Sequence, residues 1–124
     1  MKKMEITIRP ENLEKVKEIL AKSGCSGMTL FSAMGAGNQK GDASEVTISK
    51  GGEFRINLLP KIHIVVYVKD ESIEEVLLLI HEQLSSGQVG DGKVAVSDLE
   101  TVMRIRTGER GERPYRRGAM IWMI

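Results

Sequence analysis

Glycine and cationic side chains recur together in three separated segments, 35–41, 87–93 and 104–111. Backbone N–H groups that are not shielded by side chains can converge on an anion, and glycine also allows the sharp turns that such a cradle needs. Lysine and arginine add the charge that a phosphate requires, and arginine can bind it through two hydrogen bonds. Each segment alone also fits an ordinary turn. Together they predict one polyanion site assembled from three parts of the chain.

The composition fits one domain, because 124 residues can enclose a single core but not two. The formal net charge is only +1, so we expect no nucleic-acid partner that is bound by bulk electrostatics. Cys25 is the only cysteine, which excludes an internal disulfide and fits a reducing, cytoplasmic setting. No apolar run approaches the roughly 20 residues that span a bilayer, so we expect no membrane insertion.

The first half of the chain predicts a strand, a helix and a second strand. Alternating apolar residues over 4–8 predict a half-buried strand, and 11–22 has one apolar helical face that we expect to end at Gly24. A second strand is expected to run from Met28 towards Met34. Residues 37 to about 57 are polar and glycine-rich, and irregular chain of this length in a compact domain usually carries function.

The second half repeats this build. The run 62–68 is apolar enough for a central strand, and 73–84 keeps helical spacing after glutamates that suit a helix N-terminus. We expect Gly87 to end this helix, and short extended pieces at 94–99 and 102–105.

This order predicts an α+β, ferredoxin-like fold, in which an antiparallel sheet carries two helices on one face. The other face of such a sheet is open, and aromatic residues make up only 4% of the chain. The expected cover is another copy of the same chain, so we expect an oligomer.

Four motifs occur in the order and spacing typical of one protein family: 35–41, Leu59-Pro60-Lys61, 87–93 and 104–111. Over residues 1–112 the chain therefore resembles the PII nitrogen-regulatory signal-transduction proteins, whereas the tail 113–124 has no counterpart. The resemblance implies a homotrimer with ATP or ADP in clefts between neighbouring subunits, and 2-oxoglutarate held beside ATP through Mg²⁺. It also implies that the long loop at about 37–57, the T-loop of that family, binds an ammonium transporter or a nitrogen-metabolism enzyme.

The resemblance implies roles for individual residues as well. The adenine would be held by Gly27, Met28 and Thr29, and the loop entrance would be lined by Gly35, Gly37, Asn38 and Gln39. The nucleotide phosphates would meet Gly90, Asp91, Gly92 and Lys93 of one subunit, and Arg104 and Arg106 of its neighbour. The amide oxygen of Gln39 would bind Mg²⁺ as a neutral hard ligand. The 2-oxoglutarate site would comprise Gln39, Lys40, Gly41 and Lys61, with the Lys61 ammonium pairing with a carboxylate.

Several positions depart from the family pattern. Phe54 stands where many bacterial relatives carry a tyrosine that is modified with a nucleotide, and without a phenol oxygen this modification has no acceptor. Asn38 replaces a common arginine, which removes a possible phosphate contact, and Val65 replaces a common glutamate. The segment 42–52 is longer than usual, so the partner of this loop can differ.

The sequence thus favours a sensor that is not an enzyme, in which ligands shift the equilibrium of the long loop. A slow ATP-hydrolysing enzyme is an alternative, and Asp91 or Glu109 would then be its base. A nucleotide-independent trimeric interaction module on the same fold is a third possibility. His63 and His81 are expected to be structural, because neither has a partner at metal-ligand spacing.

Overall fold

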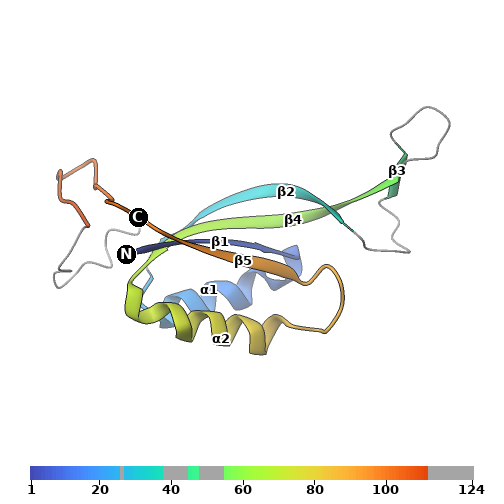
Figure 1. Cartoon of the computed structure of the whole chain (residues 1–124), viewed down its shortest axis with the longest axis horizontal. Helices are drawn as coiled ribbons and strands as arrows, with labels where there is room; N and C mark the ends of the chain where they lie inside the picture. The colour runs from blue at the N-terminus through green and yellow to red at the C-terminus, as the bar shows by residue number, and fades with distance from the viewer. Residues whose placement is uncertain (26, 38–44, 48–54, 112–124) are drawn as a thin grey trace.

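The computed structural model describes residues 1–25, 27–37, 45–47 and 55–111. Within them the strands are β1 (Lys2–Ile8), β2 (Thr29–Gly37), β3 (Glu45–Thr47), β4 (Arg55–Val68) and β5 (Gly92–Asp98). The helices are α1 (Leu13–Lys22) and α2 (Ile73–Leu84), and each follows a short 3₁₀ turn, η1 (Pro10–Asn12) or η2 (Asp70–Ser72). Figure 1 shows both helices beneath the same face of the sheet.

The sheet has the strand order β2-β4-β1-β5, and every neighbouring pair is antiparallel. Ile6 of β1 lies opposite Ile64 of β4 and Val94 of β5, which fixes the register of the central strands. This arrangement confirms the predicted α+β fold with two helices on one side of an antiparallel sheet.

The core lies between the sheet and the two helices. It consists of Met4, Ile6 and Ile8 of β1, Ile64, Val66 and Val68 of β4, Val16, Ile19 and Leu20 of α1, and Ile73, Val76, Ile80 and Leu84 of α2. These residues follow a period of two along the strands and a period near 3.6 along the helices, as the apolar pattern predicts. The intervening strand residues must therefore point to the opposite face of the sheet.

The opposite face carries a row of side chains that crosses four strands. Phe31, His63, Thr7 and Lys93 occupy adjacent register positions on β2, β4, β1 and β5. The His63 ring stacks on the Phe31 ring at a centroid distance of 5.7 Å, and its Nδ1 lies 2.9 Å from the Thr7 hydroxyl. Its Nε2 lies 3.4 Å from the carboxylate of Glu5. Half of the Phe31 surface remains exposed, so the described part of the chain leaves this face open at Phe31.

The end of α1 agrees with the sequence. Gly24 adopts a positive φ of 91°, and the Cys25 N–H donates to the Leu20 carbonyl at 3.0 Å. Cys25 packs against the edge of the core, and burial raises the pKa of its thiol to about 11. The thiol is therefore overwhelmingly protonated at neutral pH and is a poor nucleophile.

None of the helices in the described ranges has the length and apolarity to cross a membrane.

The segment expected to be irregular between 37 and 57 contains strand pairing. β2 continues to Gly37, β4 already begins at Arg55, and β3 pairs with that beginning through Glu45 opposite Asn57. The prediction was wrong here because backbone ladder bonds need no apolar side chains, and this ribbon extends beyond the core. Figure 1 shows β3 and the adjoining ends of β2 and β4 projecting away from the helices.

Two other boundaries differ from the prediction. The expected extended piece at 102–105 is wrong: only Met103 makes a bridge, to Arg110, and 105–107 form a turn. That turn is closed by backbone bonds from Gly108 to the Arg104 carbonyl at 2.8 Å and from Arg104 to the Glu109 carbonyl at 2.9 Å. The helix α2 ends at Leu84, before Gly87, because Ser85 already has an extended backbone.

Candidate functional site

The segment 86–92, which we call the glycine loop, joins α2 to β5 and requires glycine at specific positions. Gly87, Gly90 and Gly92 have positive φ values of 78°, 99° and 119°. A Cβ atom on Gly92 would lie 2.1 Å from the Thr7 carbonyl oxygen of the neighbouring strand β1, whereas a Cβ on Gly87 would meet nothing within 4 Å. The loop can therefore press its backbone against β1 only while residue 92 lacks a side chain.

A buried lysine holds the glycine loop from the sheet. Lys61 lies on β4 and is only 7% exposed, and its ammonium donates to the Gly90 carbonyl oxygen at 2.8 Å. Gly35 on β2 makes room for this side chain, because a Cβ there would lie 3.2 Å from Cγ of Lys61. The predicted loop-entrance glycine, the predicted effector lysine and the predicted phosphate loop are thus in contact.

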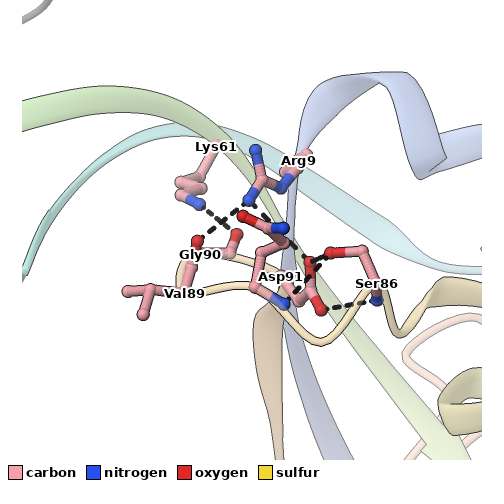
Figure 2. A network of polar contacts seen from close by, with 7 residues as sticks. Arg9, Lys61, Ser86, Val89, Gly90 and Asp91 are labelled. Atoms are coloured by element: carbon pink, nitrogen blue, oxygen red, sulfur yellow. Dashed lines mark hydrogen bonds and ion pairs between the residues drawn. The ribbon is translucent and has the colours of Figure 1, made fainter. Parts of the chain in front are cut away.

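A second cation holds the loop from β1. Arg9 directly follows this strand, and its Nη2 donates to the Val89 carbonyl oxygen at 3.0 Å. The same nitrogen lies 3.8 Å from the carboxylate of Asp91. Figure 2 shows Lys61 and Arg9 reaching the carbonyl groups of two consecutive residues of the loop.

The carboxylate of Asp91 is bound inside the loop. It accepts hydrogen bonds from the hydroxyl and the backbone N–H of Ser86, at 2.5 and 2.7 Å (Figure 2). The Ser86 hydroxyl, then the Ser86 N–H and, more weakly, the Arg9 charge lower the pKa of Asp91. A carboxylate with a lowered pKa is a weak base, so Asp91 organises the loop and is poorly suited to activate water.

The structure places the other predicted residues as follows. Lys93 is exposed near the start of β5, directly after the loop, and Gly27, Met28 and Thr29 lie at the opposite end of β2 from Gly35 and Gly37. The remaining predicted residues, Asn38, Gln39, Lys40 and Gly41, lie outside the described residues. The structure therefore brings together Gly35, Lys61, Gly90, Asp91, Gly92 and Lys93.

Arg104 and Arg106 lie at the other end of β5. This strand begins at Gly92 opposite Ile8 and finishes at Asp98 opposite Lys2, a span of roughly 20 Å at the usual rise per residue. Figure 1 shows the glycine loop and the segment 101–111 at opposite ends of the sheet. One chain alone does not unite these arginines with the glycine loop. The side chain of Ile105, which lies between Arg104 and Arg106 in the sequence, is 91% exposed.

One hollow beside the loop, on the side of α2 and β5, is largely apolar. A pocket of about 290 Å³ lies between α2 and β5, and Ile8, Ile80, Leu84 and Val94 are among its lining residues. Lys93 is the only residue with a cationic ammonium in that lining. This single-chain pocket does not resemble a triphosphate site.

Arg9 and Ser86 are site residues that the sequence analysis missed. Arg9 reads as one polar residue of an alternating strand, and Ser86 as an ordinary residue after a helix. The register that places Ile8 opposite Gly92 is what brings Arg9 to the loop, and this long-range pairing leaves no local pattern.

Comparison with known proteins gives a consistent result. The family model described as "Nitrogen regulatory protein P-II" matches residues 1–109. The "Nitrogen regulatory protein P-II" of Mesorhizobium japonicum is 41% identical over 111 residues, which cover 90% of this chain and 96% of that protein. The "Nitrogen regulatory protein P-II 2" of Methanothermobacter thermautotrophicus is 42% identical, with 91% and 96% covered. The "Nitrogen regulatory protein GlnK" of Escherichia coli strain K12 is 39% identical, with 90% and 97% covered.

The two glycines at opposite ends of the loop should respond differently to alanine. Both Gly87→Ala and Gly92→Ala place a side chain at positive φ, which costs about 1–2 kcal/mol. Gly92→Ala adds the overlap with the Thr7 carbonyl, so we expect it to lower the free energy of unfolding by more than about 4 kcal/mol or to prevent folding. Urea denaturation of both variants measures the difference, and equal losses would show that the loop does not press against β1.

The stability of the loop should depend on the ionisation of Asp91. Because the pKa of Asp91 is lowered on folding, its stabilisation is complete above the pKa of the unfolded chain and is lost as the pH falls through the folded value. Ser86→Ala removes the largest cause, so the folded pKa should rise towards its ordinary value. NMR titration of the carboxyl carbon measures it, with Ser97→Ala, an exposed serine on β5, as the control. An unchanged Asp91 pKa in Ser86→Ala would contradict the assignment.

Proposed function

Since the chain belongs to the nitrogen regulatory protein P-II family, we propose that it is a signal-transduction protein that senses ATP and ADP together with 2-oxoglutarate. It passes this information to a nitrogen-metabolism enzyme or an ammonium transporter through residues 37–57. The observation that supports the proposal best is the glycine loop itself. Two of its three positive-φ glycines, Gly90 and Gly92, flank Asp91; Lys61 donates to the Gly90 carbonyl, and Lys93 directly follows Gly92.

The nucleotide phosphates bind the glycine loop of one subunit and the arginines of the next. A triphosphate needs several donors and cations, and Gly90, Gly92 and Lys93 supply only part of them. Arg104 and Arg106 lie too far away within the same chain, so a neighbouring copy provides them. The adenine is held by Gly27, Met28 and Thr29.

The protein assembles as a homotrimer. The open face of the sheet, with its half-exposed Phe31, and the exposed Ile105 are the surfaces that such an assembly would cover. Burial of apolar surface is the main driving force of such association. The assembly also explains how two ends of one sheet contribute to one site.

The effector 2-oxoglutarate binds through Lys61. A buried ammonium close to the phosphate loop suits a carboxylate, because a charge pair is strong where water is excluded. Mg²⁺, when bound, would join the effector to the nucleotide, and the amide oxygen of Gln39 is a ligand type that this ion accepts. Gln39, Lys40 and Gly41 lie at the root of the long loop, so occupancy of this site would alter the conformations of that loop.

A regulatory role agrees better with the site than hydrolysis does. The relatives are named regulatory proteins, and the lowered pKa of Asp91 makes this residue a weak base. The protein acts in the cytoplasm, where ATP, ADP and 2-oxoglutarate are available. The remaining alternative is a trimeric module that does not bind nucleotides. Titration with ATP distinguishes it from the sensor, because only the sensor should bind the nucleotide.

Calorimetric titration with ATP and Mg²⁺, with and without 2-oxoglutarate, tests the proposal. We expect ATP to bind, and 2-oxoglutarate to increase the affinity by about 5-fold to 150-fold, the usual range of coupling between two sites. Lys93→Met should weaken ATP binding, whereas Lys22→Met, at an exposed position at the end of α1, should not.

Nucleotide sensing and 2-oxoglutarate sensing can each be contradicted separately. Absence of heat from ATP and from ADP would remove the sensor function and favour the nucleotide-independent module. Nucleotide binding that does not change with 2-oxoglutarate would remove only the effector.

A further inference from the structure

Arg9 links the end of β1 to two groups of the glycine loop at once. Its guanidinium donates to the Val89 carbonyl at 3.0 Å and lies 3.8 Å from the Asp91 carboxylate. Its backbone is extended, with φ −67° and ψ 141°, as expected for a residue that precedes a proline. Pro10 thus limits the backbone at the position from which the side chain reaches the loop.

The direction of the loop carbonyls decides where the loop N–H groups point. In a planar trans peptide the C=O and N–H bonds point in opposite directions. The Val89 carbonyl is directed at Arg9 and the Gly90 carbonyl at Lys61 (Figure 2). The N–H groups of the same two peptide units belong to Gly90 and Asp91, so the Gly90 N–H points away from Arg9 and the Asp91 N–H points away from Lys61.

We propose that Arg9 is a positioning residue of the polyanion site, which fixes the glycine loop so that the N–H groups of Gly90 and Asp91 are presented to a phosphate. Arg9 itself does not touch the phosphate in this arrangement. The identity of the anion, the phosphate chain of a nucleotide, rests on the proposed function, whereas the fixing of the loop does not.

The geometry of the contact favours arginine. One nitrogen, Nη2, lies 3.0 Å from the Val89 carbonyl oxygen and 3.8 Å from the Asp91 carboxylate, and the rigid plane of the guanidinium sets the direction of its N–H bonds. A lysine ammonium is carried on a side chain one bond shorter and lacks this rigid plane. On the far side, the Asp91 carboxylate is already held by the hydroxyl and the N–H of Ser86. Arg9 therefore connects β1 to a loop that is closed by its own hydrogen bonds.

The alternative role for Arg9 is simple attraction of an anion by its charge. The nearby Asp91 carboxylate offsets much of that charge. Lys15 lines the same polar hollow as Arg9 and Asp91, and its exposed side chain makes no hydrogen bond or ion pair with the loop in the described structure. Lys15 is thus a matched control for charge without contact.

The experiment compares Arg9→Met, Arg9→Lys and Lys15→Met with the unchanged protein. Calorimetry gives the dissociation constant for ATP with Mg²⁺, thermal unfolding gives the midpoint, and NMR gives the amide shifts of Gly90 and Asp91. We expect Arg9→Met to weaken ATP binding by about 10-fold to 100-fold, as for loss of hydrogen bonds that involve a charged group. The Gly90 and Asp91 amides should shift, and the midpoint should stay near that of Lys15→Met.

Arg9→Lys separates position from charge. We expect it to recover only part of the ATP affinity, because it keeps the charge but its shorter side chain does not bring the ammonium to the position that Nη2 occupies between Val89 and Asp91. Full recovery in Arg9→Lys, or an equal loss in Lys15→Met, would show that charge alone acts and would overturn the proposal. If Arg9→Met does not fold, the ATP affinity of Arg9→Lys tests the proposal: a partial loss supports the positioning role, and an unchanged affinity overturns it.

Failure of this inference can be distinguished from failure of the proposed function. If the unchanged protein binds no ATP, the sensor function is wrong, and the amide shifts of Gly90 and Asp91 in Arg9→Met still test whether Arg9 fixes the loop. If the unchanged protein binds ATP and Arg9→Met binds it equally well, the sensor function stands and the positioning role is wrong.

Discussion

The ammonium of Lys61, buried beside the sheet, is the constraint on which the site depends. A charged group that is removed from water must find partners within the protein, since an uncompensated one costs several kcal/mol. Lys61 meets this need partly through the Gly90 carbonyl, and its side chain packs closely against Gly35, where a Cβ atom would come within 3.2 Å of it. The position of the glycine loop thus follows from the burial of one charge on β4. Arg9 and Ser86 then fix the rest of the loop through Val89 and Asp91.

The antiparallel sheet separates the glycine loop from Arg104 and Arg106 within one chain. β5 starts at the glycine loop and leads away from it, so the described residues that follow Asp98, 99–111, lie at the far end of the sheet (Figure 1). Arg104 and Arg106 are held there by a turn closed at Gly108. A site that uses both ends of the sheet needs a second copy. The open face and the exposed Ile105 are surfaces that such a copy would bury.

The sequence predicted the layers of the fold well, because the period of the apolar residues in β1, β4, α1 and α2 directly reflects which side faces the core. It also singled out the glycine loop, because repeated glycines indicate the positive φ values that the loop has. Lys61 was named only through the family resemblance, and the phosphate and effector roles of these residues stay predictions. It missed β3 and the early start of β4, whose pairing lies beyond the core and joins segments with too few apolar residues for a clear strand pattern. It also missed Arg9, because contact with the loop depends on strand register, and it read 102–105 as a strand, although the apolar Ile105 there is almost fully exposed.

The most direct test of the account is complementation between two defective chains. One chain carries Lys93→Met and the other carries Arg104→Met with Arg106→Met; they are unfolded, mixed in equal amounts and refolded together. If the site is built across a subunit boundary, ATP binding should be nearly lost in each parent and should return in about a quarter of the sites of the mixture, as expected for random pairing in a symmetric ring. Binding that stays absent in the mixture, although mixed oligomers form, would contradict a shared site.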